Sequence, residues 1–226
     1  MSRHTLVLTC LVLAVTVAVP RAQKKSEEAE RVAEATEVFR EIMAAEDKAI
    51  PKSILGRAEA IAVFPGTKKG ALGIGGTRGR GIISTRGPKG WSSPAFFTLT
   101  GVSFGLQIGG QETDLVLVVN NKRGVETLTK NQFKLGADAS VAAGPVGRDA
   151  QAATDLQMRA EILSYSRARG VFAGISINGS TIRQDRDAHE RFYGKKLESR
   201  QILFEGQGGA PGPVAEWKGV LQKFAQ

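Results

Sequence analysis

The feature that most constrains this sequence is the change in its apolar spacing near Ala60. From there to Asn120, short runs of apolar and β-branched residues follow one another, and Gly, Pro or Asn separates each run from the next. Runs of this length between such residues are typical of β-strands. The stretch therefore predicts strands in succession, the first closed by Pro65-Gly66, at residues 60–64, 70–77, 81–85, 95–101, 102–108 and 114–120.

Residues 161–167 and 170–177 predict a further hairpin, closed by Asn178-Gly179, and residues 125–130 favour a helical turn. Helical spacing dominates both ends. In residues 27–49, Val32, Phe39 and Met43 share one face opposite acidic residues, which predicts an amphipathic helix whose apolar face packs in the core. Helices are also expected at residues 52–59, 185–193 and 214–224.

Together these patterns predict an α+β fold. We expect a largely antiparallel, glycine-rich sheet or partly closed barrel, with an N-terminal amphipathic helix and C-terminal helices. The chain divides into a signal peptide at residues 1–22, the amphipathic helix at 23–50, a main domain at 51–206, and a linker with a last helix at 207–226.

The first residues have the order of a secretory signal peptide. Arg3 precedes a short apolar run, residues 6–19, and a polar stretch follows directly, so the run is too short to span a bilayer. We therefore expect an exported, periplasmic or secreted protein, with peripheral membrane association possible. Cys10, the only cysteine, lies in this run and fits a lipoprotein signal poorly. The mature chain then has neither disulfides nor thiolate metal sites.

Charge is unevenly distributed along the chain. Residues 51–110 carry eight basic residues and one acidic residue, Glu59, whereas residues 24–50 carry five basic and eight acidic ones. The basic segment is either an anion-binding surface or solvated charge that maintains solubility. For the first alternative the candidate residues are Lys68, Lys69, Arg78, Arg80, Arg86 and Lys89, with Trp91 at the membrane interface. Outside the segment, Lys122, Arg123 and Lys130 are expected to matter less.

A set of short phrases in a fixed order resembles the SYLF domain family over residues 50–206. They include Ile50-Pro51, Ala60-Ile-Ala-Val-Phe-Pro65, Gly73-Ile-Gly-Gly-Thr-Arg-Gly-Arg-Gly81, Gly90-Trp-Ser-Ser-Pro-Ala95, Gly105-Leu-Gln-Ile-Gly-Gly110, Gly144-Pro-Val-Gly-Arg148 and Phe192-Tyr-Gly194. The resemblance implies a non-enzymatic module that binds anionic phospholipid head groups, phosphoinositides in eukaryotes, and that regulates actin in fungi. The leader makes this chain similar to exported bacterial members, for which neither phosphoinositides nor actin is an expected ligand.

Two motifs suggest other chemistry. Gly101-Val-Ser-Phe-Gly105 has the letters of a nucleophile elbow, which would use Ser103 with His189, but the residues that follow are poor helix formers. The glycine run at residues 70–81 lacks the letters of a phosphate loop, although its backbone N–H groups beside Arg78 and Arg80 could hold an anion. We expect no catalytic residues, no metal site and no cofactor.

The leading interpretation is a binding module for anionic phospholipid surfaces that uses a basic, glycine-rich face. A protein-interaction module for an acidic partner is the alternative, and a serine hydrolase using Ser103 and His189 is less favoured. No nucleic-acid partner is expected, because aromatic residues are thinly interleaved with the cations and export makes that role improbable.

The expected leader can be tested directly. N-terminal sequencing of the mature protein should begin between Val19 and Lys24, because signal peptidase cleaves after the apolar run. A mature form that retains Met1 would contradict the assignment.

Overall fold

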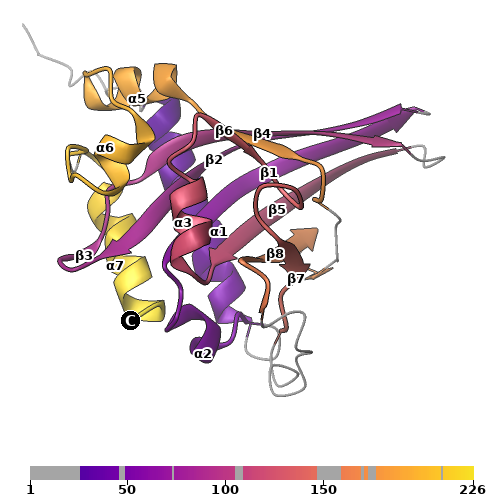
Figure 1. The fold of residues 1–226 in the computed structure, drawn as a ribbon, viewed down its shortest axis with the longest axis horizontal. Helices are drawn as coiled ribbons and strands as arrows, with labels where there is room; N and C mark the ends of the chain where they lie inside the picture. Colours follow the sequence, from indigo (N-terminus) through magenta and orange to yellow (C-terminus); the bar gives the residue numbers. More distant parts are fainter. Residues whose placement is uncertain are drawn as a thin grey trace, which may run out of the picture.

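The structure, a computed structural model, describes residues 26–45, 49–72, 74–104, 109–146, 159–168, 171–172, 177–209 and 211–226. The expected signal peptide lies outside these residues. The fold is α+β, as predicted, and its largest element is a strongly curled sheet that is antiparallel except at one edge (Figure 1).

Four long strands form the centre of the sheet: β1 (Ala60–Leu72), β2 (Ile74–Gly87), β4 (Ala95–Phe104) and β5 (Gly109–Val119). The order across the sheet is β6-β10-β4-β2-β1-β5-β8-β7, and the short strands β3 and β9 pair with β2 and β8. The outer strands are β3 (Gly90–Trp91), β6 (Gln132–Lys134), β7 (Val141–Ala143), β8 (Ile162–Ala168), β9 (Val171–Phe172) and β10 (Thr181–Gln184).

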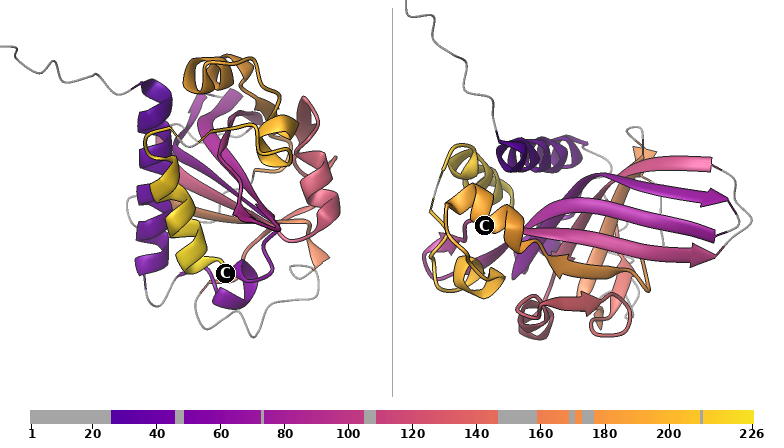
Figure 2. Two further views of the ribbon diagram at one scale, coloured as in Figure 1. Left: turned by 90° about the vertical axis from the view of Figure 1, so that its left-hand side faces the viewer. Right: turned by 90° about the horizontal axis from the view of Figure 1, so that it is seen from above.

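Helices cover both faces of one half of the sheet. The amphipathic helix α1 (Glu27–Ala44) lies beside α7 (Val214–Phe224) on one face, and α3 (Lys122–Thr127) lies on the other side of the sheet (Figure 2). The remaining helices are α2 (Lys52–Leu55), α5 (Arg186–Tyr193) and α6 (Ser199–Leu203). Beyond the register shift in β1, residues 67–72 and the paired parts of β2, β4 and β5 form the other half of the four long strands. The far end of this half projects past the helices (Figure 2), and we call this half the blade.

Two apolar layers follow from the alternation of side chains along the strands. Val63, Ile82 and Val116 point toward α1 and α7, where they join Val32 and Phe39 in one buried cluster. Met43 is partly buried against the same cluster, so the prediction that this helix packs in the core is confirmed. The neighbouring strand residues belong to a second cluster on the opposite face: Ala62, Phe64, Ile83, Phe97, Leu115 and Leu117.

Strand β1 does not end at Pro65-Gly66, so that prediction was wrong. It continues through a β-bulge, where the pairing with β5 passes from Phe64–Leu115 to Thr67–Thr113. Gly66 supplies a positive φ of 51°, and its N–H donates to Asp114 Oδ1 at 3.0 Å. A bulge inserts one extra residue into one strand, which reverses the faces of everything beyond it. Consequently Lys68, five residues after Val63, lies on the same face as Val63.

Other boundaries also differ from the sequence prediction. Residues 95–104 form the single strand β4 rather than two strands, and α1 ends at Ala44 rather than Ala49. Helix α3 begins earlier than expected because Asn121 Oδ1 accepts from the Gly124 N–H and caps it. The sequence patterns missed β10 and α6, whose four and five residues are too short for a periodic signal.

His189 connects a helix, a strand and a loop inside the core. Its ring is fully buried; Nε2 accepts from the Phe96 N–H at 2.8 Å, and Nδ1 lies 2.8 Å from the Leu197 carbonyl oxygen. Because Nε2 accepts, the ring proton is on Nδ1, which donates to Leu197. Burial lowers the pKa of His189 below its usual value of 6.5, although the contact with the Leu197 carbonyl and the charge of Asp185 act in the opposite direction.

This burial predicts a pH-dependent stability. The folded-state pKa lies below the unfolded one, so the stabilisation is complete above the unfolded value and decreases as pH falls through the folded value. Urea unfolding should show falling stability from about pH 7.5 to about pH 5.5, above the range of most carboxylates. In His189→Ala the decrease over this window should be smaller, and the variant should be about 2–4 kcal/mol less stable at neutral pH. An unchanged pH profile in His189→Ala would contradict this account.

Candidate functional site: a charged cleft between helix and sheet

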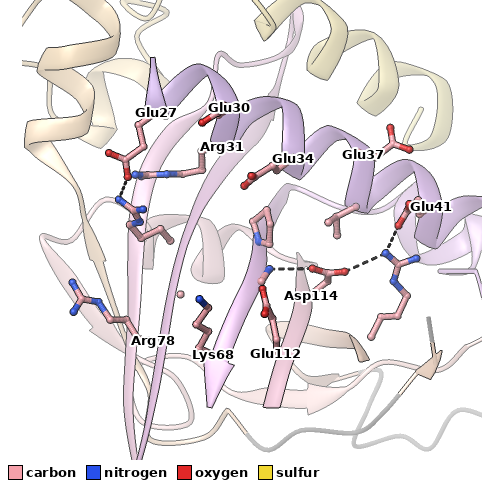
Figure 3. A pocket seen from close by; sticks show the side chains of 16 residues that line it. Glu27, Glu30, Arg31, Glu34, Glu37, Glu41, Lys68, Arg78, Glu112 and Asp114 are labelled. Carbon is pink, nitrogen blue, oxygen red and sulfur yellow. Dashed lines mark hydrogen bonds and ion pairs between the residues drawn. The ribbon is translucent and has the colours of Figure 1, made fainter. Parts of the chain in front are cut away.

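A cleft of about 770 Å³ lies between α1 and the part of the sheet that carries no apolar row (Figure 3). We call it the charged cleft. Its ionisable residues are Glu27, Glu30, Arg31, Glu34, Glu37 and Glu41 from α1, Lys68, Arg78, Arg80, Glu112 and Asp114 from β1, β2 and β5, and Arg167 from β8. Val38, Pro65, Gly66 and Gly79 complete the lining.

The sheet wall of the charged cleft continues the face that packs on α1. Arg80 and Arg78 lie two and four residues before Ile82 on β2, so they share its face. The bulge brings Lys68 opposite Arg78, and Lys68 lies opposite Glu112 on its other side. Charged side chains therefore replace apolar ones along these strands at the point where cover by α1 and α7 gives way to solvent.

The helix wall is acidic. Glu27, Glu30, Glu34, Glu37 and Glu41 recur at spacings of three and four, which places them along one stripe of α1. The opposite stripe of α1 carries its buried apolar residues, including Val32, Phe39 and Ile42. The helix is thus held by its apolar face, while its acidic stripe borders the basic side chains of the sheet.

Ion pairs connect the two walls near both ends of α1. Glu27 pairs with Arg80 near the N-terminus, and both side chains are about half exposed. Near the C-terminus Arg167 Nη2 bonds Glu41 and also Asp114 Oδ2, the latter at 3.1 Å. Between these ends, the side chains of Glu30, Glu34, Lys68 and Arg78 form neither hydrogen bonds nor ion pairs within the described part of the chain.

Arg31 is the buried cation of the charged cleft. The residue is 4% exposed, its Cζ lies 5.4 Å from the centroid of the Phe96 ring, and Nη1 is 3.4 Å from Asp185 Oδ2. Nη2 is buried and has no hydrogen-bond partner in the structure. Burial lowers the pKa of Arg31, and the nearby Arg80 guanidinium lowers it further, while Asp185 raises it. This end of the cleft therefore has an unused donor.

The structure brings together three of the residues proposed from sequence, Lys68, Arg78 and Arg80. Lys69 is a neighbour of Lys68 but lies on the other face of β1, opposite Thr77 and Gln111. Lys89 is exposed in the turn between β2 and β3, at the end of β2 away from the blade. The basic segment is thus distributed over both faces and both ends of the sheet.

Trp91 is buried, and the partly buried Arg86 packs against it. Arg86 donates to the Ala58 and Leu55 carbonyl oxygens at 2.7 and 2.9 Å, and its Cζ lies 4.8 Å from the Trp91 ring centroid. Trp91 is 3% exposed, and its Nε1 donates to the Ala225 carbonyl oxygen. Burial lowers the pKa of Arg86. Because both side chains have these partners inside the fold, we leave them out of the proposed binding surface.

Most of the glycine run lies between two paired strands, although residues 79–81 have no partner in β1, where the register shifts. Strand β2 is central, and its residues 74–83 pair with both β1 and β4 for most of this length. Its glycines allow close approach: a Cβ on Gly81 would lie 2.3 Å from the Val63 carbonyl oxygen.

The hydrolase alternative does not fit the fold. Ser103 is inside β4 and pairs with Gly75, with no helix directly after it in the described residues. His189 is hydrogen-bonded at Phe96, seven residues away along the strand, about 23 Å at the usual rise. Both of its ring nitrogens already have backbone partners. The described residues also contain no cluster of His, Cys, Asp and Glu that could hold a metal ion.

Sequence reasoning missed the acidic stripe and Arg31 as cleft residues. The sequence pattern indicated the acidic stripe as the polar face of a helix. It could not place this stripe over the basic strands, because that position depends on packing between distant parts of the chain. Arg31 carried no signal, because a single arginine in an acidic helix is typical of a solvated face. Arg167 was likewise visible only as the end of a predicted strand.

Comparisons with known proteins identify relatives of this chain. The family model described as "Ysc84: Las17-binding protein actin regulator" matches residues 100–224. SH3 domain-containing YSC84-like protein 1 of Homo sapiens is 32% identical over 203 residues, which cover 88% of this chain and 59% of that protein. Protein YSC84 of Saccharomyces cerevisiae is 35% identical over 161 residues, 70% of this chain and 34% of that protein. The chain thus spans between a third and three fifths of the length of these relatives, whose names describe no enzyme.

A reactivity test addresses the remaining chemical alternative. A fluorophosphonate probe should not label the purified protein, because Ser103 lies seven residues along β4 from Phe96, the residue to which the His189 ring is hydrogen-bonded. Active-site labelling is read by gel fluorescence, with heat-denatured protein as the control. Labelling of native protein that disappears in Ser103→Ala would show that the chain has a reactive serine.

Proposed function

The chain belongs to the Ysc84 family, whose shared domain is the SYLF domain, and we propose that it is a non-enzymatic module for anionic phospholipid surfaces. The family is linked to actin regulation and to lipid binding, and a binding role is compatible with the fold. The finer statement, that the ligand surface is anionic phospholipid, rests on the charges of the projecting blade.

One observation carries this proposal. Lys68, Lys69 and Arg78 lie side by side on β1 and β2 beyond the register shift in β1, and none of them has a carboxylate partner among the described residues. Since Lys68 and Lys69 point to opposite faces, the blade presents cations on both sides. Each cation near an anionic membrane contributes about 1 kcal/mol before screening.

The described surface offers little apolar material for insertion. Phe204, 44% exposed, is the exposed large hydrophobic residue of the described chain. No helix in the part that the structure describes combines the length and the apolar character needed to cross a bilayer. Attachment by the described residues would therefore be peripheral and electrostatic, and its strength would depend on ionic strength.

A protein partner is the second candidate, because the family description names Las17 binding and actin regulation. The same three cations would then contact an acidic protein surface. We also propose export, on the leader alone. In that case the partner would be an envelope or extracellular component rather than a cytoskeletal one.

Vesicle flotation tests the membrane proposal. The wild-type protein should bind vesicles that contain anionic lipid, and binding should weaken steeply as salt rises beyond about 0.1 M, where the screening length is about 10 Å. Changing Lys68, Lys69 and Arg78 together to Gln should reduce binding by up to about a hundredfold at low salt. The variant should remain folded, because none of the three residues is buried and charges of this kind contribute little to stability.

A matched triple variant controls for net charge. Lys122, Lys130 and Lys195 are exposed and lie on or after the helices α3 and α5, outside the paired rows of Lys68, Lys69 and Arg78, so their replacement by Gln should have a smaller effect. Equal losses in the two triple variants would refute a localised surface. If wild-type protein ignores anionic vesicles but binds a defined acidic protein, the protein-interaction alternative replaces the membrane proposal.

A further inference from the structure

The charged cleft has two walls of opposite sign. The helix wall carries five glutamates, and Figure 3 shows Glu30 and Glu34 on this side, with Lys68 and Arg78 on the side of the sheet. Including Glu112 and Asp114, the lining holds seven carboxylates and five cations, so the cleft as a whole is not basic. A simple anion that approaches the cations of the sheet would be repelled by the glutamates of the helix. A simple cation that approaches those glutamates would be repelled by the cations of the sheet.

The members that lack partners are found on both walls. Arg80 and Arg167 already pair with carboxylates, whereas the side chains of Glu30, Glu34, Lys68 and Arg78 have no ion pair in the described residues. Opposite charges that face each other across an open cleft without contact can both be satisfied by a ligand that carries an ammonium and an anionic group. Such a ligand avoids the repulsion that either group alone would meet.

Arg31 adds a buried positive charge at the end of the charged cleft where Glu27 pairs with Arg80. It is more than nine-tenths buried, it lines the charged cleft, and its Nη2 donor has no acceptor. A buried donor without a partner is destabilising, and guanidinium groups suit phosphate because they donate two parallel hydrogen bonds. Arg78 and Lys68 lie opposite each other on β2 and β1, and two cations at this spacing favour a phosphate, which has several acceptor oxygens, over a smaller carboxylate as the anionic group.

We propose that the charged cleft binds an aminophosphate zwitterion of the phosphoethanolamine class, either as a lipid head group or as a free molecule. The phosphate lies toward Arg78, Lys68 and the Arg31 end of the cleft, and the ammonium donates to Glu30 and Glu34. The proposal shares Lys68 and Arg78 with the proposed membrane surface, but it does not depend on membrane attachment.

Titration calorimetry with soluble ligands tests the proposal in the full chain. Wild-type protein should bind phosphoethanolamine more tightly than inorganic phosphate or ethanolamine. Glu34→Gln should weaken phosphoethanolamine binding by about two- to fivefold and strengthen inorganic phosphate binding by a similar factor, because it removes one carboxylate. Arg78→Gln should weaken both ligands. Glu126→Gln, which removes an exposed carboxylate from α3, is the matched control and should change neither.

Opposite signs for the two ligands in Glu34→Gln are the decisive result. Equal wild-type affinity for phosphate and phosphoethanolamine, or a Glu34→Gln effect of the same sign on both ligands, would overturn the proposal. Vesicles of phosphatidylethanolamine compared with phosphatidylcholine separate the sources, since the choline ammonium has no N–H to donate. Binding of only the soluble ligand assigns the site to a free metabolite, and binding of both assigns it to the head group.

The membrane proposal can fail separately from this one. Salt-sensitive binding to anionic vesicles, with no preference for the zwitterion, would retain the proposed function and remove the cleft ligand. Binding of phosphoethanolamine by a protein that does not bind anionic vesicles would retain the cleft ligand and remove the proposed membrane function.

Discussion

Burial of the central sheet on both faces is the constraint on which the rest of the structure depends. Strands β1, β2, β4 and β5 alternate between two apolar clusters, so every second side chain must find cover on a different side. Helices α1 and α7 cover one face, with Phe39 and Trp217 in edge contact at 5.9 Å, and Trp217 Nε1 donates to Ser84 Oγ on β2. Where this cover ends, the same strand faces carry charged side chains, and the charged cleft begins.

Helix α1 has two separate tasks on its two faces. Its apolar stripe is anchored by fully buried residues such as Val32 and Phe39, so the helix cannot be displaced without exposing core. Its acidic stripe therefore stays beside Arg80 and Lys68, and it reduces the positive potential of this part of the sheet. Any anion-binding surface on the blade must therefore depend on Lys68, Lys69 and Arg78, the cations there that have no carboxylate partner among the described residues.

The sequence could predict the fold class and most elements because their patterns are local. Alternation along β4 and β5 and the helical spacing of Val32, Phe39 and Met43 depend only on which residues are apolar. The site was harder to predict, because it depends on pairings over long separations. Nothing near Arg86 indicates that it donates to carbonyls at Leu55 and Ala58, or that Trp91 is covered by the chain end at Ala225. The same holds for Arg31, whose partner Asp185 is 154 positions away.

The β-bulge at Pro65 and Gly66 separates two halves of β1. An insertion of one residue there can change which face the side chains of the second half occupy, while those of the first half keep their positions. A deletion of one residue at the bulge would give a regular strand in which Val63 and Lys68 still share a face. An insertion of one residue between Thr67 and Lys68 would exchange Lys68 with Lys69, so that the side chain facing α1 would turn to the opposite side. The core half of the strand would be untouched in both cases. Relatives that differ by one residue here can thus keep one core and present either lysine to the cleft.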